Sequence, residues 1–198
     1  MFVQVITGRI NDRDAVQRLG AQWNEEIRPG ASGFLGATIG ITPDGRLVNA
    51  ARFESRAAAE ANSERPEQGE WWAEFEKCFA ESPAFRESDD VLVYERGDLD
   101  SAGFVQVMEG RLLDIERARS FARETQAMLA SERPDLLGDV QVIYPDGSCT
   151  DIAYFTSEAA AREGESKSPS PEAQAAMQQM DEIWQVDQYL DVREPWLF

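Results

Sequence analysis

The sequence predicts an α+β protein built from two copies of one β-α-β-β-α-β unit, and three observations support this prediction. Residues 2–5 (FVQV) return unchanged 102 residues later, at residues 104–107. At the same offset, ten of the nineteen residues from 41 to 59 are identical to their counterparts in 143–161. Strand-like and helix-like patterns also follow one another in the same order in both halves. A period of about 100 residues is typical of a whole small domain, so we expect two similar halves.

The first repeat is expected to span residues 1–97. Residues 2–9 alternate and are rich in β-formers, which predicts a strand. Asp12 is a suitable cap for the following helix, which we expect to end near residues 28–30. Apolar side chains recur there at spacings of three or four, as expected for one helical face: Val16, Leu19, Trp23 and Ile27.

A hairpin and a divided helix complete the first repeat. Pro43-Asp44-Gly45 predicts a tight turn between strands at 33–42 and 46–53. Ser55 is expected to cap an Ala-rich helix that breaks near Pro66 and resumes through residues 71–79. Residues 91–95 are predicted to be the closing strand of this repeat.

Residues 98–103 are predicted to be a short polar linker, and residues 104–198 a second ferredoxin-like repeat with a C-terminal tail. The polar, Pro-rich segment 165–171 again divides the second helix. The apolar tail at 194–198 has two open interpretations: a clasp over the first repeat or a contact between two chains. The expected elements are strands at 104–111, 136–144, 148–155 and 186–192, and helices at 114–131 and from 157 to about 184.

The composition limits the partners of the chain. The formal net charge is −18, and no basic patch is visible, so binding to nucleic acid or to an anionic membrane is disfavoured. No apolar run approaches the roughly 20 residues of a membrane span, and no signal peptide is visible, so we expect a cytoplasmic location. The expected state is a monomer with an internal pseudo-dimer, or a homodimer.

The chain contains no histidine, and its two cysteines are not spaced as a metal site. This absence excludes imidazole as a catalytic base or a ligand, and with it the Ser-His-Asp and Cys-His systems. We therefore expect no metal and no cofactor. Any chemistry must depend on carboxylate, Arg, Tyr, Trp or Asn side chains.

The order β-α-β-β-α-β is the ferredoxin-like arrangement. Both alternating sets of strand residues contain apolar side chains, so we expect the two sheets to be covered on both faces. With the repeat and the divided second helix, this order resembles the dimeric α/β barrel superfamily, which includes antibiotic biosynthesis monooxygenase-like domains. The resemblance covers the whole chain and implies a tandem duplication that forms a pseudo-dimeric α/β barrel.

The resemblance further implies a small-molecule pocket between helices and sheet. Residues that differ between the copies are the most informative, and Asn49 and Arg52 are replaced by Asp151 and Tyr154. We interpret Arg52 and Asn49 as candidate catalytic residues, because either could stabilise a substrate oxyanion or enolate. The candidate ligand-binding residues are Trp23, Asn24, Trp71 and Trp72. Members of the superfamily that degrade haem use Trp and Asn with a ligating His, which this chain lacks.

Two interpretations of the aromatic residues stay open, because Trp23, Trp72 and Phe75 at helical spacing also fit a packed core. We expect the first repeat to keep a usable pocket and the second to serve mainly as a scaffold. The leading function is small-molecule handling, as a cofactor-independent monooxygenase-like enzyme acting on a planar aromatic or phenolic compound. The alternative is a non-catalytic ligand-binding or stress-associated protein of the same fold, so catalysis itself stays open.

Overall fold

The computed structural model describes all 198 residues and divides them into two compact units. Unit 1 comprises residues 1–89 and 196–198, and unit 2 comprises residues 90–195. Each unit is a five-stranded antiparallel sheet with its own helices, as in a ferredoxin-like domain. The sequence prediction of a tandem α+β repeat is confirmed.

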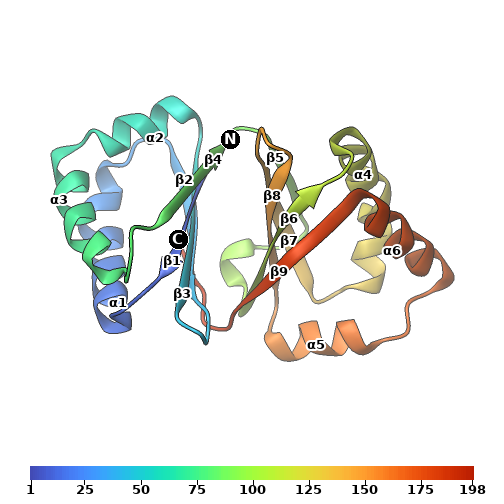
Figure 1. Ribbon diagram of the computed structural model, residues 1–198. Helices are drawn as coiled ribbons and strands as arrows, with labels where there is room; N and C mark the ends of the chain where they lie inside the picture. The colour runs from blue at the N-terminus through green and yellow to red at the C-terminus, as the bar shows by residue number, and fades with distance from the viewer. The chain divides into compact units, whose positions relative to one another are not determined.

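Unit 1 has the strand order β10-β2-β3-β1-β4. Figure 1 shows its three helices on one face of this sheet. A π-helical turn at Trp23–Ile27 extends the first helix. The elements are β1 (Phe2–Arg9), α1 (Arg13–Gln22), β2 (Phe34–Ile41), β3 (Arg46–Phe53), α2 (Arg56–Ser63), α3 (Pro66–Phe75), β4 (Ala84–Ser88) and β10 (Trp196–Leu197).

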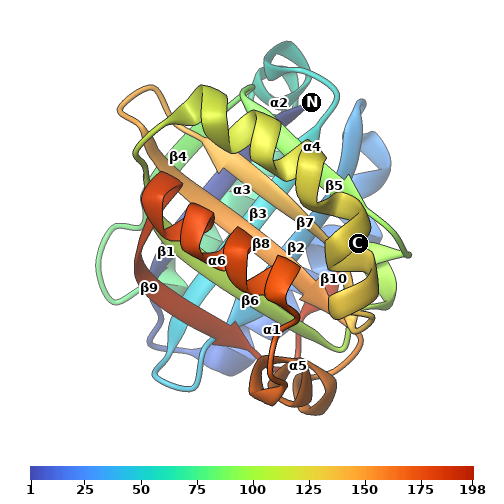
Figure 2. The ribbon, with the colours of Figure 1, turned by 90° about the vertical axis from the view of Figure 1, so that its right-hand side faces the viewer.

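Unit 2 has the strand order β5-β7-β8-β6-β9. In Figure 2, α4 and α6 lie across its sheet, and α5 lies near one end. None of the helices in either unit combines the length and apolar character that a membrane crossing needs. The elements are β5 (Val91–Glu95), β6 (Phe104–Leu112), α4 (Ile115–Glu132), β7 (Leu136–Ile143), β8 (Ser148–Phe155), α5 (Glu158–Ser166), α6 (Pro171–Ile183) and β9 (Trp184–Val192).

The internal repeat is preserved in the strand register. Phe2 lies opposite Phe53 in unit 1, and Phe104 lies opposite Phe155 in unit 2. The helix caps repeat as well, because Ser55 and Ser157 each accept a hydrogen bond from a backbone N–H three residues later. The matching registers place residues 102 apart at equivalent positions on the two sheets.

The edge strands differ from the sequence prediction. Residues 91–95 form a strand, but this strand pairs with β7 in unit 2, and the first sheet is closed by β4. The division between the units therefore falls at residue 90 rather than in the expected linker at 98–103. At the other end of the chain, β10 pairs with β2 in unit 1, so the C-terminal tail is a clasp on the first repeat.

Candidate functional site

A cavity of about 260 Å³ lies between the sheet and the helices of unit 1. Because successive residues of a strand point to opposite faces, one alternating set from each strand lines the cavity. On β3 this set includes Asn49, Ala51 and Phe53. On the neighbouring strands it consists of Gln4 and Ile6 from β1 and Ala37 and Ile39 from β2.

Aromatic side chains form much of the cavity wall. The Trp23 ring meets the Phe34 ring edge to face, with centroids 4.9 Å apart. Trp72 meets the half-exposed Phe85 in the same manner, at 5.2 Å. Such ring pairs contribute roughly 0.5–1.5 kcal/mol beyond the apolar area they bury. The wall therefore offers flat apolar surfaces that suit a planar ligand.

Two indole groups are held in place by hydrogen bonds. Trp23 Nε1 donates to Gln68 Oε1 at 2.8 Å, which ties the π-helical turn to α3. Trp71 Nε1 donates to the carbonyl oxygen of Leu19 at 2.8 Å, and the Trp71 ring stacks on Phe75 at 4.6 Å. Since these contacts fix the rings without a ligand, the cavity is preformed.

Asn49 is the main polar feature of the cavity floor. Its side chain is buried, with 9% exposed, and Oδ1 has no hydrogen-bond donor. Nearly all buried polar groups in folded proteins have a partner, so an unpartnered amide that lines a cavity indicates a position for a ligand.

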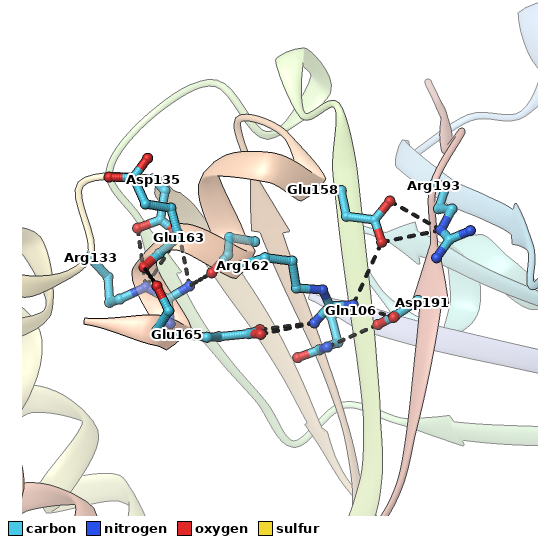
Figure 3. Close-up of polar contacts among 11 residues, drawn as sticks. Gln106, Arg133, Asp135, Glu158, Arg162, Glu163, Glu165, Asp191 and Arg193 are labelled. Carbon is cyan, nitrogen blue, oxygen red and sulfur yellow. Dashed lines mark hydrogen bonds and ion pairs between the residues drawn. The ribbon is translucent and has the colours of Figure 1, made fainter. Parts of the chain in front are cut away.

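Gln4 lies on the same sheet face as Asn49. Its equivalent in unit 2 is Gln106, and the two amides differ in their contacts. Gln106 Nε2 donates to Asp191 Oδ1 at 2.9 Å, and Asp191 is also bound by Arg162 (Figure 3). Glu87 is the residue opposite Gln4 on β4, as Asp191 is opposite Gln106 on β9. The Glu87 carboxylate forms an ion pair with Arg56. Gln4 is consequently available to the cavity that it lines.

No ionisable side chain lines this cavity. A charged ligand would lose its hydration without gaining a counter-ion, which is costly in a partly dry site. The arrangement suits an uncharged, planar molecule that can exchange hydrogen bonds with amide groups.

The structure brings together four of the six residues predicted from the sequence: Trp23, Asn49, Trp71 and Trp72 line one cavity. Arg52 does not join them. It is three residues from Asn49 on β3, so it lies on the opposite face of the sheet, where its guanidinium covers Gly36. Asn24 also lies outside the cavity, and its Oδ1 accepts a hydrogen bond from Arg28 at 2.7 Å.

Sequence reasoning missed several residues of the cavity. Gln4 is not among the predicted site residues, although its register opposite Ala51 places it on the face of Asn49. Phe34, Gln68 and Phe85 were not singled out. Alternation along β3 is the signal that would have excluded Arg52, and the pairing of β1 with β3 is what places Gln4 on the cavity face. The core interpretation of the aromatic residues holds as well, since Trp71 and Trp72 pack against the buried Phe75.

Unit 2, which the sequence predicts to serve mainly as a scaffold, also contains a cavity. This cavity encloses about 110 Å³ and is lined by two carboxylic acids, Asp139 and Asp151. Burial raises the pKa of Asp151 to about 7. Burial and the nearby charge of Asp151 raise the pKa of Asp139 well above its usual value. The cavity of unit 1 is therefore lined by uncharged side chains, whereas the cavity of unit 2 contains two carboxylic acids.

Comparison with solved structures identifies the fold. A candidate monooxygenase from Lactobacillus acidophilus NCFM aligns with a TM-score of 0.70 at 12% identity, covering 96% of this chain and 91% of that one. An anthrone oxidase-like protein aligns with a TM-score of 0.62 at 12% identity, covering 96% and 92%. An uncharacterised ferredoxin-fold protein from Listeria monocytogenes 4b F2365, described as related to antibiotic biosynthesis monooxygenases, aligns at 0.50 with 13% identity, covering 98% and 95%.

No protein-family model matches the sequence. No curated protein matches it either. The likeness therefore rests on the backbone, over nearly the full length of this chain and of the structures it matches. The chain therefore shares its fold, two ferredoxin-like units in tandem, with solved proteins described as antibiotic biosynthesis monooxygenase-like.

Proposed function

We propose that unit 1 binds an uncharged, planar aromatic compound with a phenol or carbonyl group and oxygenates it without a cofactor. The observation that carries this proposal is the buried amide of Asn49 on the floor of an aromatic cavity, where its Oδ1 has no hydrogen-bond donor and can accept from a phenol hydroxyl. The fold neighbours described as a candidate monooxygenase and an anthrone oxidase-like protein are consistent with such chemistry.

An anthrone illustrates the reaction. Its methylene group loses a proton to water, and the side-chain NH2 groups of Asn49 and Gln4 donate hydrogen bonds to the resulting enolate oxygen. The electron-rich enolate reduces dioxygen, and a carbon–oxygen bond forms, giving a hydroperoxide. Loss of the second methylene proton and cleavage of the O–O bond release water and leave a carbonyl. One dioxygen is consumed for each quinone and each water formed.

A non-catalytic binding protein is the second candidate. It is favoured by the absence of any ionisable side chain in the cavity, because no protein group there can accept the substrate proton. In this case the aromatic cavity would bind the same class of molecule and release it unchanged.

The test uses anthrone, with dioxygen uptake and anthraquinone formation measured against the rate in buffer alone. We expect the wild-type protein to accelerate both, with one dioxygen consumed for each quinone formed. Asn49→Leu should lower kcat about 100-fold, the usual loss when a donor to a developing oxyanion is removed. Asn24→Leu is the matched control, because Asn24 lies outside the cavity, and its rate should stay within twofold of wild type.

Quenching of tryptophan fluorescence separates the two candidates. Saturable quenching by anthrone with dioxygen uptake equal to buffer would establish the binding protein and exclude the oxygenase. Absence of saturable quenching would contradict both.

A further inference from the structure

Three substitutions between the repeats change the chemistry of one sheet face. At the positions that hold Ala37, Ile39 and Asn49 in unit 1, unit 2 holds Asp139, Gln141 and Asp151. The unit 1 residues line the neutral cavity, and their counterparts line the cavity of unit 2. Compared with unit 1, the sheet face of unit 2 therefore has two additional acceptor-bearing side chains, Asp139 and Gln141, and a carboxyl group in place of the Asn49 amide.

The register places these three side chains next to one another. Gln141 on β7 lies directly opposite Asp151 on β8, and Asp139 is two residues from Gln141 on the same face. Diagonal neighbours of this kind have Cβ atoms about 7–8 Å apart or less, so both carboxyl groups can reach one small ligand.

One carboxyl oxygen of Asp151 lacks a partner, and a hydrogen bond from the Ile152 backbone offsets only part of the effect of burial on the pKa of this group. Asp151 is 8% exposed, and its Oδ1 has no hydrogen-bond donor. No Arg or Lys side chain lines the cavity, so no cation balances either carboxyl group. A buried carboxylate without a counter-ion is costly, and a ligand that supplies positive charge removes this cost.

We propose that the cavity of unit 2 is a second binding site, which takes a small primary amine with an apolar body, bound as its ammonium cation. An ammonium group has three hydrogen-bond donors, and the site offers three acceptors: the Asp139 and Asp151 carboxyl groups and the Gln141 amide oxygen. The structure contains no group of three or more carboxylate, His or Cys side chains that could hold a metal ion, which favours an organic cation.

The remaining walls define the body of the ligand. They are mostly aliphatic and aromatic, and they come from β5, β6, α4, α6 and β9: Leu92, Leu112, Phe121, Met180, Ile183 and Trp184. Apolar cavities of about 150 Å³ hold one benzene ring, so a volume of about 110 Å³ suits a branched chain of four or five carbons.

Affinity for the amine should depend on pH. The ionisable side chains that line the cavity are Asp139 and Asp151 from the sheet and Tyr94 from β5, while α4, α6 and β9 contribute none. The Tyr94 hydroxyl donates to the carbonyl oxygen of Gln126 at 3.5 Å. Since Asp151 ionises near pH 7 and stays protonated below it, the cation should bind more tightly at pH 8 than at pH 5.

The experiment compares 3-methylbutylamine with 3-methylbutan-1-ol, which has a similar apolar body and no charge. Binding is followed by NMR on the Trp184 indole and Met180 methyl signals of the full chain. At pH 8 the amine should bind at least tenfold more tightly than the alcohol, and this advantage should fall at least tenfold at pH 5. Equal affinities within twofold at pH 8, or shifts confined to unit 1 signals, would overturn the proposal.

Two variants introduce residues that the first repeat already tolerates. Asp151→Asn and Asp139→Ala reproduce Asn49 and Ala37, and each should weaken amine binding at least tenfold while leaving alcohol binding unchanged. Asp187→Asn, on β9 outside the cavity, is the matched control and should bind as wild type. Unchanged amine affinity in Asp151→Asn would contradict the site. If that variant does not fold, Asp139→Ala and the comparison on wild-type protein decide the question.

Discussion

Asn49 and Asp151 occupy equivalent positions in the two repeats, and both are buried with an unpartnered side-chain oxygen. An amide at this position leaves the cavity neutral, whereas a carboxyl group makes it acidic and raises its own pKa through burial. The difference of one atom in these side chains therefore separates a site for uncharged molecules from a site for cations.

Asp151 should make stability depend on pH. An unfolded Asp ionises near about pH 3.9, whereas Asp151 in the folded protein keeps its proton up to about pH 7. The folded state binds the proton more tightly, so the free energy of unfolding falls as pH rises between these values and is then constant. Asp151→Asn should raise the free energy of unfolding by up to about 4 kcal/mol at pH 8 and by much less at pH 5.

Urea unfolding at the two pH values measures this difference, with Asp187→Asn as the control for removing an exposed carboxylate. An equal change at pH 5 and pH 8 would show that Asp151 titrates normally in the folded protein.

Comparison of the two copies of β3 in the sequence selected Asn49, which lines the cavity of unit 1. The same comparison also selected Arg52, which lies on the other face of the sheet. Differences between repeats mark positions that have diverged, but only the alternation of a strand says which of them share a face.

At the scale of elements, the edge strands explain why both repeats have a glycine at the same position, Gly36 in unit 1 and Gly138 in unit 2. Gly36 and Gly138 have φ angles of +150° and +159° at the same irregularity in β2 and β7. A Cβ on Gly138 would lie 2.3 Å from the Tyr94 carbonyl oxygen on β5, and one on Gly36 would lie 2.5 Å from that of Phe198, just after β10. Each glycine therefore leaves room for the strand added at the edge.

Gly138→Ala should destabilise unit 2 by roughly 1–3 kcal/mol, because the methyl group meets backbone and the φ angle disfavours a side chain. Gly20→Ala in α1 meets nothing within 4 Å, and it should raise stability by roughly 0.5–1 kcal/mol. Thermal unfolding compares the two. A midpoint for Gly138→Ala at or above that of wild type would contradict the proposed role of this glycine.

The assignment of β5 could not be predicted from the sequence. Alternation identified residues 91–95 as a strand, but only two residues separate it from β4, which closes the first sheet itself. A short strand is compatible with either sheet edge, and its partner is fixed by tertiary packing rather than by its own residues. The glycines at 36 and 138 are the one local signal that a further strand approaches.

At the scale of the whole molecule, the 102-residue repeat predicted the two units, their hairpins and their divided second helices. It did not predict that both units hold a cavity, because the second cavity depends on three side chains that differ from the first copy. The repeat fixes the scaffold, whereas single residues on one sheet face determine what each copy can bind.

The most direct test of this account is a titration of one protein sample with two ligands, followed on the tryptophan indole NMR signals at pH 8. We predict that 2-naphthol, an uncharged planar phenol, shifts the signals of Trp23, Trp71 and Trp72, which line the cavity of unit 1. Subsequent addition of 3-methylbutylamine should shift Trp184 without displacing the naphthol. Displacement of one ligand by the other, or movement of the same signals by both, would contradict the claim that unit 1 binds uncharged planar molecules and unit 2 binds ammonium cations in separate cavities.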